Sequence, residues 1–580
     1  MLDIFKHLNN IIPKKEKKKI PFFFVINILT MFLETFGIAM IIPLISVITS
    51  GNFIYQNEIS RQVLDILGNP PREQILIITM ILIVIVFIIK NLIIGLFIWL
   101  QYNFAHKLQL SLSAKLYENY LKKNFLFHVK TNSSKLIRNT SNEPNTIRNA
   151  IMDLFIIIAD LSIVIGLILL LIYFDPITNS YIIGSLILIS SIFFLLIRNR
   201  VKKWGLIRLK MSGQSLKDLT QGYGGIKEIK ILGKENFFLN IFTNNLKNLV
   251  NMNILNGFLK ALPKLFLELL GIFILFSLII ILTLNAENSI EKIITSLSLF
   301  TLSIFKILPS LVRILSSAQN LRFRMASIEL LSDEFKKFKN DKNIKIDSTS
   351  TAISFVEDPH QLEIKNLYFS YEQEGQKGLK DISCTIEKNS ILGIFGPSGS
   401  GKSTLINLIL GLIEPKNGKI FYNKKNIFEN LKSWQSIIGL IPQNIYLIDD
   451  KIKNNIALGI EEKEIDINLL HRCIKMAELD QFIYNLPQGI ETIVGERGAR
   501  ISGGELQRIG IARALYRNPK ILILDEATSS LDAINEKKIM NTIESIKKGK
   551  IVILISHRQS IIEYCTKIIE IESGRIKLIK

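Results

Sequence analysis

Three short segments in the C-terminal part of the chain contain the residue types that bind and hydrolyse nucleoside triphosphates. They are Gly396-Pro-Ser-Gly-Ser-Gly401-Lys402-Ser403, Ile501-Ser-Gly-Gly-Glu505 and Leu524-Asp525-Glu526-Ala-Thr-Ser-Ser-Leu-Asp532. Lysine and glycine amides hold phosphates, and carboxylates hold Mg²⁺ or accept a proton from water. Because a long apolar half precedes these segments, their order predicts ATP hydrolysis that drives transport across a bilayer.

The first segment has the composition of a phosphate-binding loop, because its glycines let backbone amides converge on phosphates. We expect Lys402 to reach the β- and γ-phosphates and Ser403 to coordinate Mg²⁺. A strand predicted over 391–395 precedes the loop and a helix predicted over 404–410 follows it, which is the context that this motif requires. The predicted phosphate site consists of Gly396, Ser398, Gly399, Gly401, Lys402, Ser403 and Thr404.

The third segment places two carboxylates at the end of a strand predicted over 521–524. We expect Asp525 to lie beside Mg²⁺ and Glu526 to be the general base for the attacking water. His557 follows another predicted strand, 551–555, and is expected to contact the γ-phosphate. An isolated histidine more often has a structural role, but its place after a strand of this domain favours the catalytic one.

The N-terminal half contains six apolar stretches of membrane-spanning length. They cover 20–48, 75–100, 151–174, 181–197, 255–282 and 293–315, and Pro309 is predicted to break the last. The connections 101–148 and 198–253 are long and basic, so the positive-inside rule predicts that they and both termini are cytoplasmic. Helices are therefore expected to extend beyond the bilayer, with turns near 124–132 and 221–229 that contact the soluble part.

These features predict a multi-domain protein. An all-α transmembrane domain with six spans over 1–335 is followed by a linker over 336–361 and an α/β P-loop nucleotide-binding domain over 362–580. The first outer loop, 50–72, has the spacing of a short amphipathic helix, which would rest either on the membrane surface or on the protein.

The composition excludes some classes of function. The net charge of +21 reflects a chain rich in lysine, and many cations flank the spans, where they set orientation. No aromatic residues interleave with this charge, so nucleic-acid binding is not predicted. The three cysteines all lie in the half predicted to be cytosolic and are expected to be free thiols.

Taken together, the motifs resemble those of the ATP-binding cassette (ABC) transporters, and the resemblance covers essentially the whole chain. It implies that Tyr371 stacks on adenine and that Gln443 senses the metal and the γ-phosphate. It further assigns nucleotide contacts to Ser502, Gly503, Gly504 and Asp532. The cofactors implied are ATP and Mg²⁺.

In this family the signature segment completes the active site of the opposite protomer. A chain with one membrane domain and one nucleotide-binding domain is therefore a half-transporter. The resemblance therefore implies a homodimer with two shared ATP sites, since every catalytic motif is intact. One departure from the family pattern is Glu505, where the signature usually has glutamine. The serine and glycines of the signature are present, so nucleotide binding is expected to persist.

Charged residues inside predicted spans indicate the cargo, because burying charge in a bilayer is costly. Glu34 in the first span and Lys90 in the second both fall near the bilayer midplane, at about 1.5 Å per residue. They form either a structural pair or part of a substrate cavity.

Further cations occur in the fifth and sixth spans. Lys264 is four positions before Glu268 and pairs with it in one interpretation. Lys306 and Arg313 have no acidic neighbour in sequence. They either face a cavity that accepts an anionic head group or extend toward the interface. The predicted substrate cavity contains Glu34, Lys90, Lys264 and Lys306.

The membrane half also resembles the flippases for lipid-linked oligosaccharides of bacterial protein glycosylation. The matching residues are 32–37 through Pro43, 89–91, His128 and 132–138. This resemblance implies that an anionic polyprenyl-pyrophosphate-linked glycan is flipped across a bacterial inner membrane. The alternative is a general lipid, lipid A or multidrug exporter. A soluble cassette ATPase would lack the six spans, and an importer usually carries its membrane and ATP parts on separate chains.

Overall fold

The computed structural model describes residues 2–40, 71–174, 176–284, 290–340, 354–371, 378–495, 501–526 and 533–579. Most of the predicted outer-loop helix and Asp532 lie outside these ranges. The chain forms two compact units. The helical unit contains Met1–Lys123 and Lys130–Ile344, and the sheet unit contains Asn124–Val129 and Lys345–Lys580.

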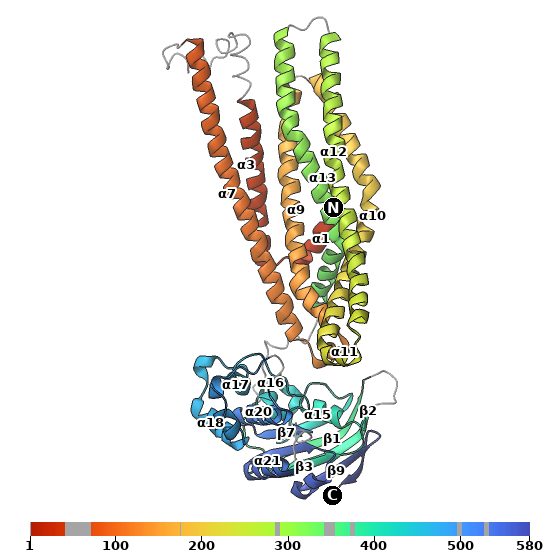
Figure 1. The fold of residues 1–580 in the computed structure, drawn as a ribbon, viewed down its shortest axis with the longest axis vertical. Coiled ribbons are helices and arrows are strands. Elements are labelled where there is room, and N and C mark those ends of the chain that lie inside the picture. The colour runs from red at the N-terminus through yellow and green to blue at the C-terminus, as the bar shows by residue number, and fades with distance from the viewer. Residues whose placement is uncertain are drawn as a thin grey trace. The chain divides into compact units, whose positions relative to one another are not determined.

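In the described residues of the helical unit, six long helices contain the six predicted spans, the first of them only as far as residue 40. Figure 1 shows them running side by side as a bundle. They are α3 (Ile20–Ala39), α7 (Arg72–Leu121), α9 (Ser133–Phe174), α10 (Pro176–Gly224), α12 (Glu235–Leu284) and α13 (Ile290–Asn340). The shorter helices are α1 (Leu2–Ile11), α2 (Lys14–Lys17), α8 (Phe125–Lys130) and α11 (Ile226–Leu232).

The long helices exceed what a bilayer requires. Four helical segments of the described chain are long and apolar enough to span one: Lys14–Ala39, Glu73–Leu121, Ser133–Tyr173 and Thr301–Asn340. At about 1.5 Å per residue, a helix of 50 residues such as α7 is about 75 Å long, compared with about 30 Å of hydrocarbon. The prediction that the helices continue beyond the bilayer is therefore confirmed.

The prediction that Pro309 breaks the sixth span is wrong. Helix α13 runs without interruption from Ile290 to Asn340 with Pro309 inside it. Packed transmembrane helices tolerate proline, because neighbouring groups compensate for the lost backbone hydrogen bond.

The bundle buries a stripe of branched side chains from α3, α9, α12 and α13. This cluster contains Ile38, Ile163, Leu167, Leu171, Leu267, Ile274, Ile304, Ile307, Leu311 and Leu315. Large apolar side chains such as Phe24, Leu82 and Leu92 are instead exposed on the outside. Apolar residues on both faces are what a helix between protein and lipid requires.

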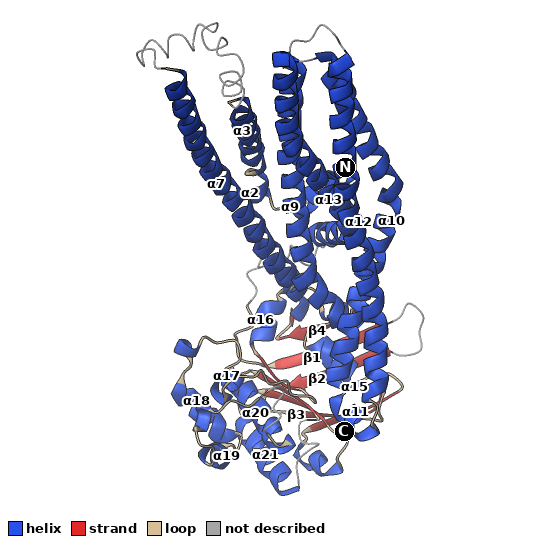
Figure 2. Ribbon diagram, turned by 45° about the horizontal axis from the view of Figure 1, so that its top comes forward, coloured by secondary structure: helices blue, strands red, loops and turns tan. Residues whose placement is uncertain are grey.

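The sheet unit contains two sheets, and Figure 2 shows that its helices surround them. An antiparallel sheet has the order β2-β1-β4-β5, and a six-stranded sheet has the order β10-β9-β3-β8-β7-β6. The strands are β1 (Gln361–Ser370), β2 (Gly378–Glu387), β3 (Ile391–Phe395), β4 (Asn417–Tyr422), β5 (Lys425–Asn426), β6 (Ile438–Ile441), β7 (Ile521–Asp525), β8 (Ile551–Ile555), β9 (Lys567–Glu572) and β10 (Arg575–Ile579). From β9 to β6 neighbouring strands are parallel.

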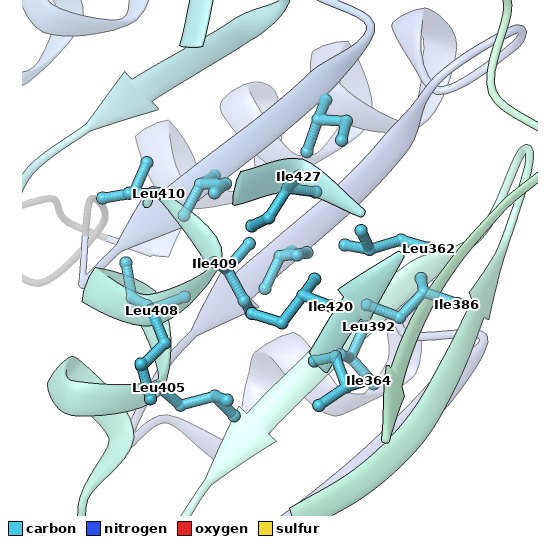
Figure 3. Packing of buried hydrophobic residues seen from close by; sticks show 14 of the residues in the cluster. Leu362, Ile364, Ile386, Leu392, Leu405, Leu408, Ile409, Leu410, Ile420 and Ile427 are labelled. Carbon is cyan, nitrogen blue, oxygen red and sulfur yellow. The ribbon is translucent and has the colours of Figure 1, made fainter. Parts of the chain in front are cut away.

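Helices cover these sheets and enclose two hydrophobic clusters. They are α15 (Lys402–Ile409), α16 (Leu431–Ser436), α17 (Ile452–Ile456), α18 (Ile467–Met476), α19 (Asp480–Tyr484), α20 (Gly503–Tyr516) and α21 (Ala533–Ile546). One cluster packs α15 against both sheets, and Figure 3 shows Ile409 of α15 beside Ile420 of β4. Leu126 of α8 packs against this same cluster. The predicted contact near 124–132 is therefore confirmed.

Candidate active site

The parallel sheet brings the predicted catalytic segments together. The phosphate loop follows β3, Gln443 follows β6, Glu526 follows β7 and His557 follows β8. In the register of the sheet, Ile441 pairs with Leu524 and Asp525 with Ile555. Because carboxyl ends of parallel strands meet at one edge, these loops lie around one site.

The phosphate loop requires glycine for two physical reasons. Gly396, Gly399 and Gly401 have φ values of 141°, 79° and 112°, a region that favours glycine. A Cβ on Gly396 would also lie 2.2 Å from the Ile571 carbonyl oxygen. Neighbouring backbone thus leaves no room for a side chain at that position.

Lys402 begins α15 and is buried inside this loop. Its Nζ donates hydrogen bonds to the carbonyl oxygens of Gly396 at 2.8 Å and Pro397 at 2.9 Å. Burial lowers the pKa of Lys402, and the nearby Glu526 and Asp525 oppose this shift. The buried Oγ of Ser400 has no hydrogen-bond partner among the described residues. The loop therefore offers a cation and a free polar atom to a phosphate.

Glu526 contacts residues that follow two of the other strands, β6 and β8. Its carboxylate accepts a hydrogen bond of 2.6 Å from Gln443 Nε2 and lies 3.1 Å from His557 Nε2. Its φ of 51° is unusual for a residue with a side chain and indicates backbone strain held by the surrounding fold. Burial raises the pKa of the adjacent Asp525, and the Glu526 charge raises it further.

The signature segment begins a helix, and this gives Glu505 a physical role. Ser502 caps α20, accepting from the Glu505 backbone N–H at 3.4 Å, while the Glu505 carboxylate accepts from the Ser502 N–H at 3.0 Å. This reciprocal pair is a capping box. A carboxylate also interacts favourably with the positive end of a helix. The departure from glutamine therefore keeps the local structure of the signature.

Helix α20 is tied to the segment that follows Gln443. Arg513 of α20 donates to the carbonyl oxygens of Asn455 at 2.7 Å and Tyr446 at 2.9 Å. The Asn455 side chain in turn accepts from Ile448 N–H at 3.0 Å. The sequence reasoning missed Arg513 and Asn455. No local sequence pattern marks these two residues, because the burial of Asn455 and the partners of Arg513 are set by the fold.

The remaining predicted residues lie around the loop or outside the described chain. Ser403 is exposed and Thr404 half-buried in the first turn of α15, and Ser398 is exposed in the loop. Tyr371 follows β1, and its ring lies edge-on to Phe369 at 4.9 Å, which leaves it partly exposed. Asp532 is not described.

Known protein families match both units of the chain. The model of the ABC transporter domain matches residues 379–529, and that of the ABC transporter transmembrane region matches residues 19–307. The ATP-dependent lipid A-core flippase of Ralstonia nicotianae is 25% identical over 479 residues, 81% of this chain and 79% of that protein. The chain belongs to the ABC exporters, as a half-transporter. It is an ATP-hydrolysing transport ATPase and a multi-pass membrane protein.

Other relatives of this exporter agree with that assignment. Multidrug resistance protein 1 of Entamoeba histolytica is 34% identical over 302 residues, 50% of this chain and 22% of that protein. The structure of a bacterial Atm1-family ABC exporter with ATP bound matches with a TM-score of 0.75 and 21% identity, covering 96% of this chain and 94% of that one. This last similarity establishes the shared fold.

A buried charge cluster joins three helices of the exporter's helical unit. Glu34 Oε2 on α3 lies 3.1 Å from Lys90 Nζ on α7 and 3.1 Å from Lys306 Nζ on α13. Lys90 also lies over the Phe87 ring, 4.1 Å from its centroid. The pairing of Glu34 with Lys90 is confirmed, and Lys306 has an acidic neighbour that its sequence surroundings do not reveal.

The other two predicted cations differ from their sequence interpretations. Lys264 is exposed on α12, and no ion pair joins it to Glu268 in the part of the chain described. Arg313 does not extend as a free cation toward the interface, because Asp160 of α9 binds it through two hydrogen bonds of 2.8 and 2.5 Å. That partner is 153 residues away in sequence, so local patterns could not identify it.

Proposed function

We propose that this exporter flips an anionic lipid-linked molecule, in our favoured case a polyprenyl-pyrophosphate-linked oligosaccharide, across a bacterial inner membrane. The observation that carries the proposal is the cluster of Glu34 with Lys90 and Lys306. One carboxylate neutralises one ammonium, so the cluster keeps one positive charge. An isolated charge in a membrane domain is costly and marks a functional site by default.

The burial of the cluster supports a role in binding rather than in packing alone. The side chains of Lys90 and Glu34 are 4% and 9% exposed, whereas the side chain of Lys306 is 39% exposed. Lys306 is therefore the more accessible of the two lysines that share the buried carboxylate. A phosphate or pyrophosphate group would supply the missing negative charge. We propose the exposed Lys264 as a further cation of the same set.

For ATP hydrolysis we propose that Lys402 holds the β- and γ-phosphates and that Glu526 accepts the proton of the attacking water at its carboxylate. Gln443 and His557 orient that carboxylate, as their distances to it suggest. Asp525 and Ser403 offer the oxygen ligands that Mg²⁺ prefers. When bound, Mg²⁺ would neutralise phosphate charge and offset the burial that raises the Asp525 pKa.

We further propose a homodimer in which Ser502, Gly503 and Gly504 complete the partner's nucleotide site. Support comes from α11, whose Ile226, Ile231 and Leu232 are exposed to solvent in the single chain. Protein interfaces often contain such apolar side chains when they lie together on one surface. The positive-inside pattern favours a cytoplasmic location for the sheet unit and both termini.

The experiment is a flipping assay in vesicles that contain the reconstituted exporter. Single substitutions Lys90→Gln, Lys264→Gln and Lys306→Gln are expected to reduce flipping of a fluorescent polyprenyl-pyrophosphate glycan, with basal ATPase activity unchanged. The matched control Lys247→Gln removes an exposed charge from α12 outside the predicted spans. Unchanged flipping in the Lys90 and Lys306 variants contradicts the anion site.

The relatives named for lipid A-core or multidrug transport favour a second candidate, a general lipid or drug exporter. Substrate-stimulated ATPase activity separates the two. Stimulation by the pyrophosphate glycan supports the favoured cargo. Stimulation only by lipid A or by hydrophobic drugs supports the general lipid or drug exporter and excludes the pyrophosphate glycan as the cargo.

A further inference from the structure

The N-terminal helix α1 is a surface helix fixed to the bundle. Its side chains Ile4, Leu8 and Ile11 are almost fully buried at spacings of four and three residues, and α1 packs on α13. Asn10 Nδ2 donates to Ser332 Oγ of α13 at 3.3 Å. The helix is therefore amphipathic, with one apolar face committed to the protein.

A cavity of about 440 Å³ lies between the α1–α2 segment and the spans. This volume is within the range of about 300–1,000 Å³ that holds small organic ligands. Most of its walls are apolar side chains, among them Leu8, Ile12, Phe104, Ile151, Phe155 and Ile158. They come from α1, α7 and α9 and from the turn between α1 and α2. The mechanism proposed above uses none of them.

The polar part of this cavity is positively charged. Lys6 of α1 and Lys17 of α2 line it together with Asn9. Glu16, next to Lys17, is held by Lys19 at 2.9 Å, and Asp3, three positions before Lys6 in α1, forms no ion pair with it among the described residues. Within the described chain, Lys6 and Lys17 form no ion pair. The cavity thus combines an apolar interior with two uncompensated cations.

The residues next to the cavity show whether a ligand would enter it from water or from the lipid bilayer. Ile20 lines the cavity at the start of α3, and the exposed apolar residues Phe22, Phe24 and Val25 follow it on that helix. This outer face belongs to a helix long and apolar enough to span a bilayer. The cavity therefore borders lipid, at the cation-rich end of the first span.

We propose that this cavity binds one anionic phospholipid, whose acyl chain occupies the apolar interior and whose phosphate is held by Lys6 and Lys17. The apolar walls match an acyl chain, and the two ammonium groups match a head group with net negative charge. The site shares no residue with the Glu34 cluster. It is a lipid site separate from the proposed cargo site and independent of the cargo's identity.

The test is native mass spectrometry of the full-length purified exporter titrated with phosphatidylglycerol or phosphatidylcholine. The double substitution Lys6→Gln/Lys17→Gln is expected to weaken phosphatidylglycerol binding by about 30-fold, or roughly fivefold per lysine near a membrane surface. The control Lys14→Gln/Lys15→Gln removes the same charge from the same segment but from residues outside the cavity. It is expected to leave the tightest bound lipid in place.

A second pair of variants tests the apolar part. Ile158→Trp fills the cavity from α9 and is expected to abolish the tight lipid peak, whereas Leu161→Trp lies on the exposed face of the same helix and is expected to retain it. Equal losses in the two double-lysine variants would show only diffuse surface attraction and overturn the proposal. Equal binding of phosphatidylcholine, or retained binding in Ile158→Trp, would also overturn it.

Discussion

Replacing Glu526 by glutamine tests whether this side chain is needed for ATP hydrolysis or for the structure of the site. The carboxylate accepts from Gln443 at 2.6 Å and lies 3.1 Å from His557 Nε2. The amide oxygen of Glu526→Gln accepts from Gln443 Nε2, and its NH₂ group donates to His557 Nε2 when that nitrogen carries no proton, so both contacts can form. The Glu526 charge also raises the pKa of Asp525, and its removal relieves that repulsion. Folding and ATP binding are therefore expected to survive.

The rate, in contrast, is expected to fall steeply. An amide cannot accept the proton from the attacking water, and a positioned general base contributes roughly 10²- to 10⁴-fold. That range equals about 3 to 5 kcal/mol of activation free energy, at about 1.36 kcal/mol per tenfold. The assay is steady-state phosphate release from reconstituted exporter, together with binding of a fluorescent ATP analogue.

The matched control for this variant is Glu461→Gln, which removes an exposed carboxylate from the same unit. It is expected to hydrolyse ATP at the unsubstituted rate. Hydrolysis by Glu526→Gln within about tenfold of that rate would remove Glu526 as the base. Loss of ATP binding in the same variant would show instead that the carboxylate supports the site's structure.

Three further predictions concern the sheet unit. Burial raises the Asp525 pKa above its unfolded value, so the charged carboxylate lowers the stability of the fold at neutral pH. Asp525→Asn is therefore expected to raise the melting temperature measured at pH 7 without nucleotide. This gain is expected to shrink as the pH falls toward the ordinary aspartate pKa of about 3.9. An unchanged or lowered melting temperature at pH 7 contradicts this. Burial raises the pKa of the thiols of Cys384, Cys473 and Cys565 to about 11. Maleimide at pH 7 is therefore expected to label the native exporter far more slowly than the urea-unfolded chain. Equal labelling rates would refute this prediction. Glu505→Ala removes half of the capping box and is expected to lower the stability of the α20 N-terminus by about 1 kcal/mol. The measurement is hydrogen exchange in the first turn of α20, which is expected to be roughly fivefold faster. Glu505→Gln keeps the acceptor, so its first turn is expected to exchange more slowly than that of the alanine variant.

The sequence was sufficient for features whose physics is local. Glycines with free backbone, a lysine and a serine between a strand and a helix predict a phosphate loop from the local sequence. Likewise, the apolar strand before Asp525 and Glu526 predicts from the local sequence that these carboxylates lie at a strand end. Parallel strands bring their carboxyl ends to one edge, so the meeting of Gln443, Glu526 and His557 follows from three strand assignments. Spans were predictable because lipid requires about twenty apolar residues.

Contacts between long helices depended on the tertiary structure. A helix that is apolar on both faces gives no periodic signal for which side meets its neighbours, so its rotation cannot be read from the sequence. The structure alone shows that Glu34 is shared by Lys90 and Lys306 and that Arg313 is held by Asp160. It also shows that Pro309 leaves α13 intact. The sequence determined the motor's parts, and packing between helices decided how charge is arranged in the membrane, because ion pairs there form across helices rather than along them.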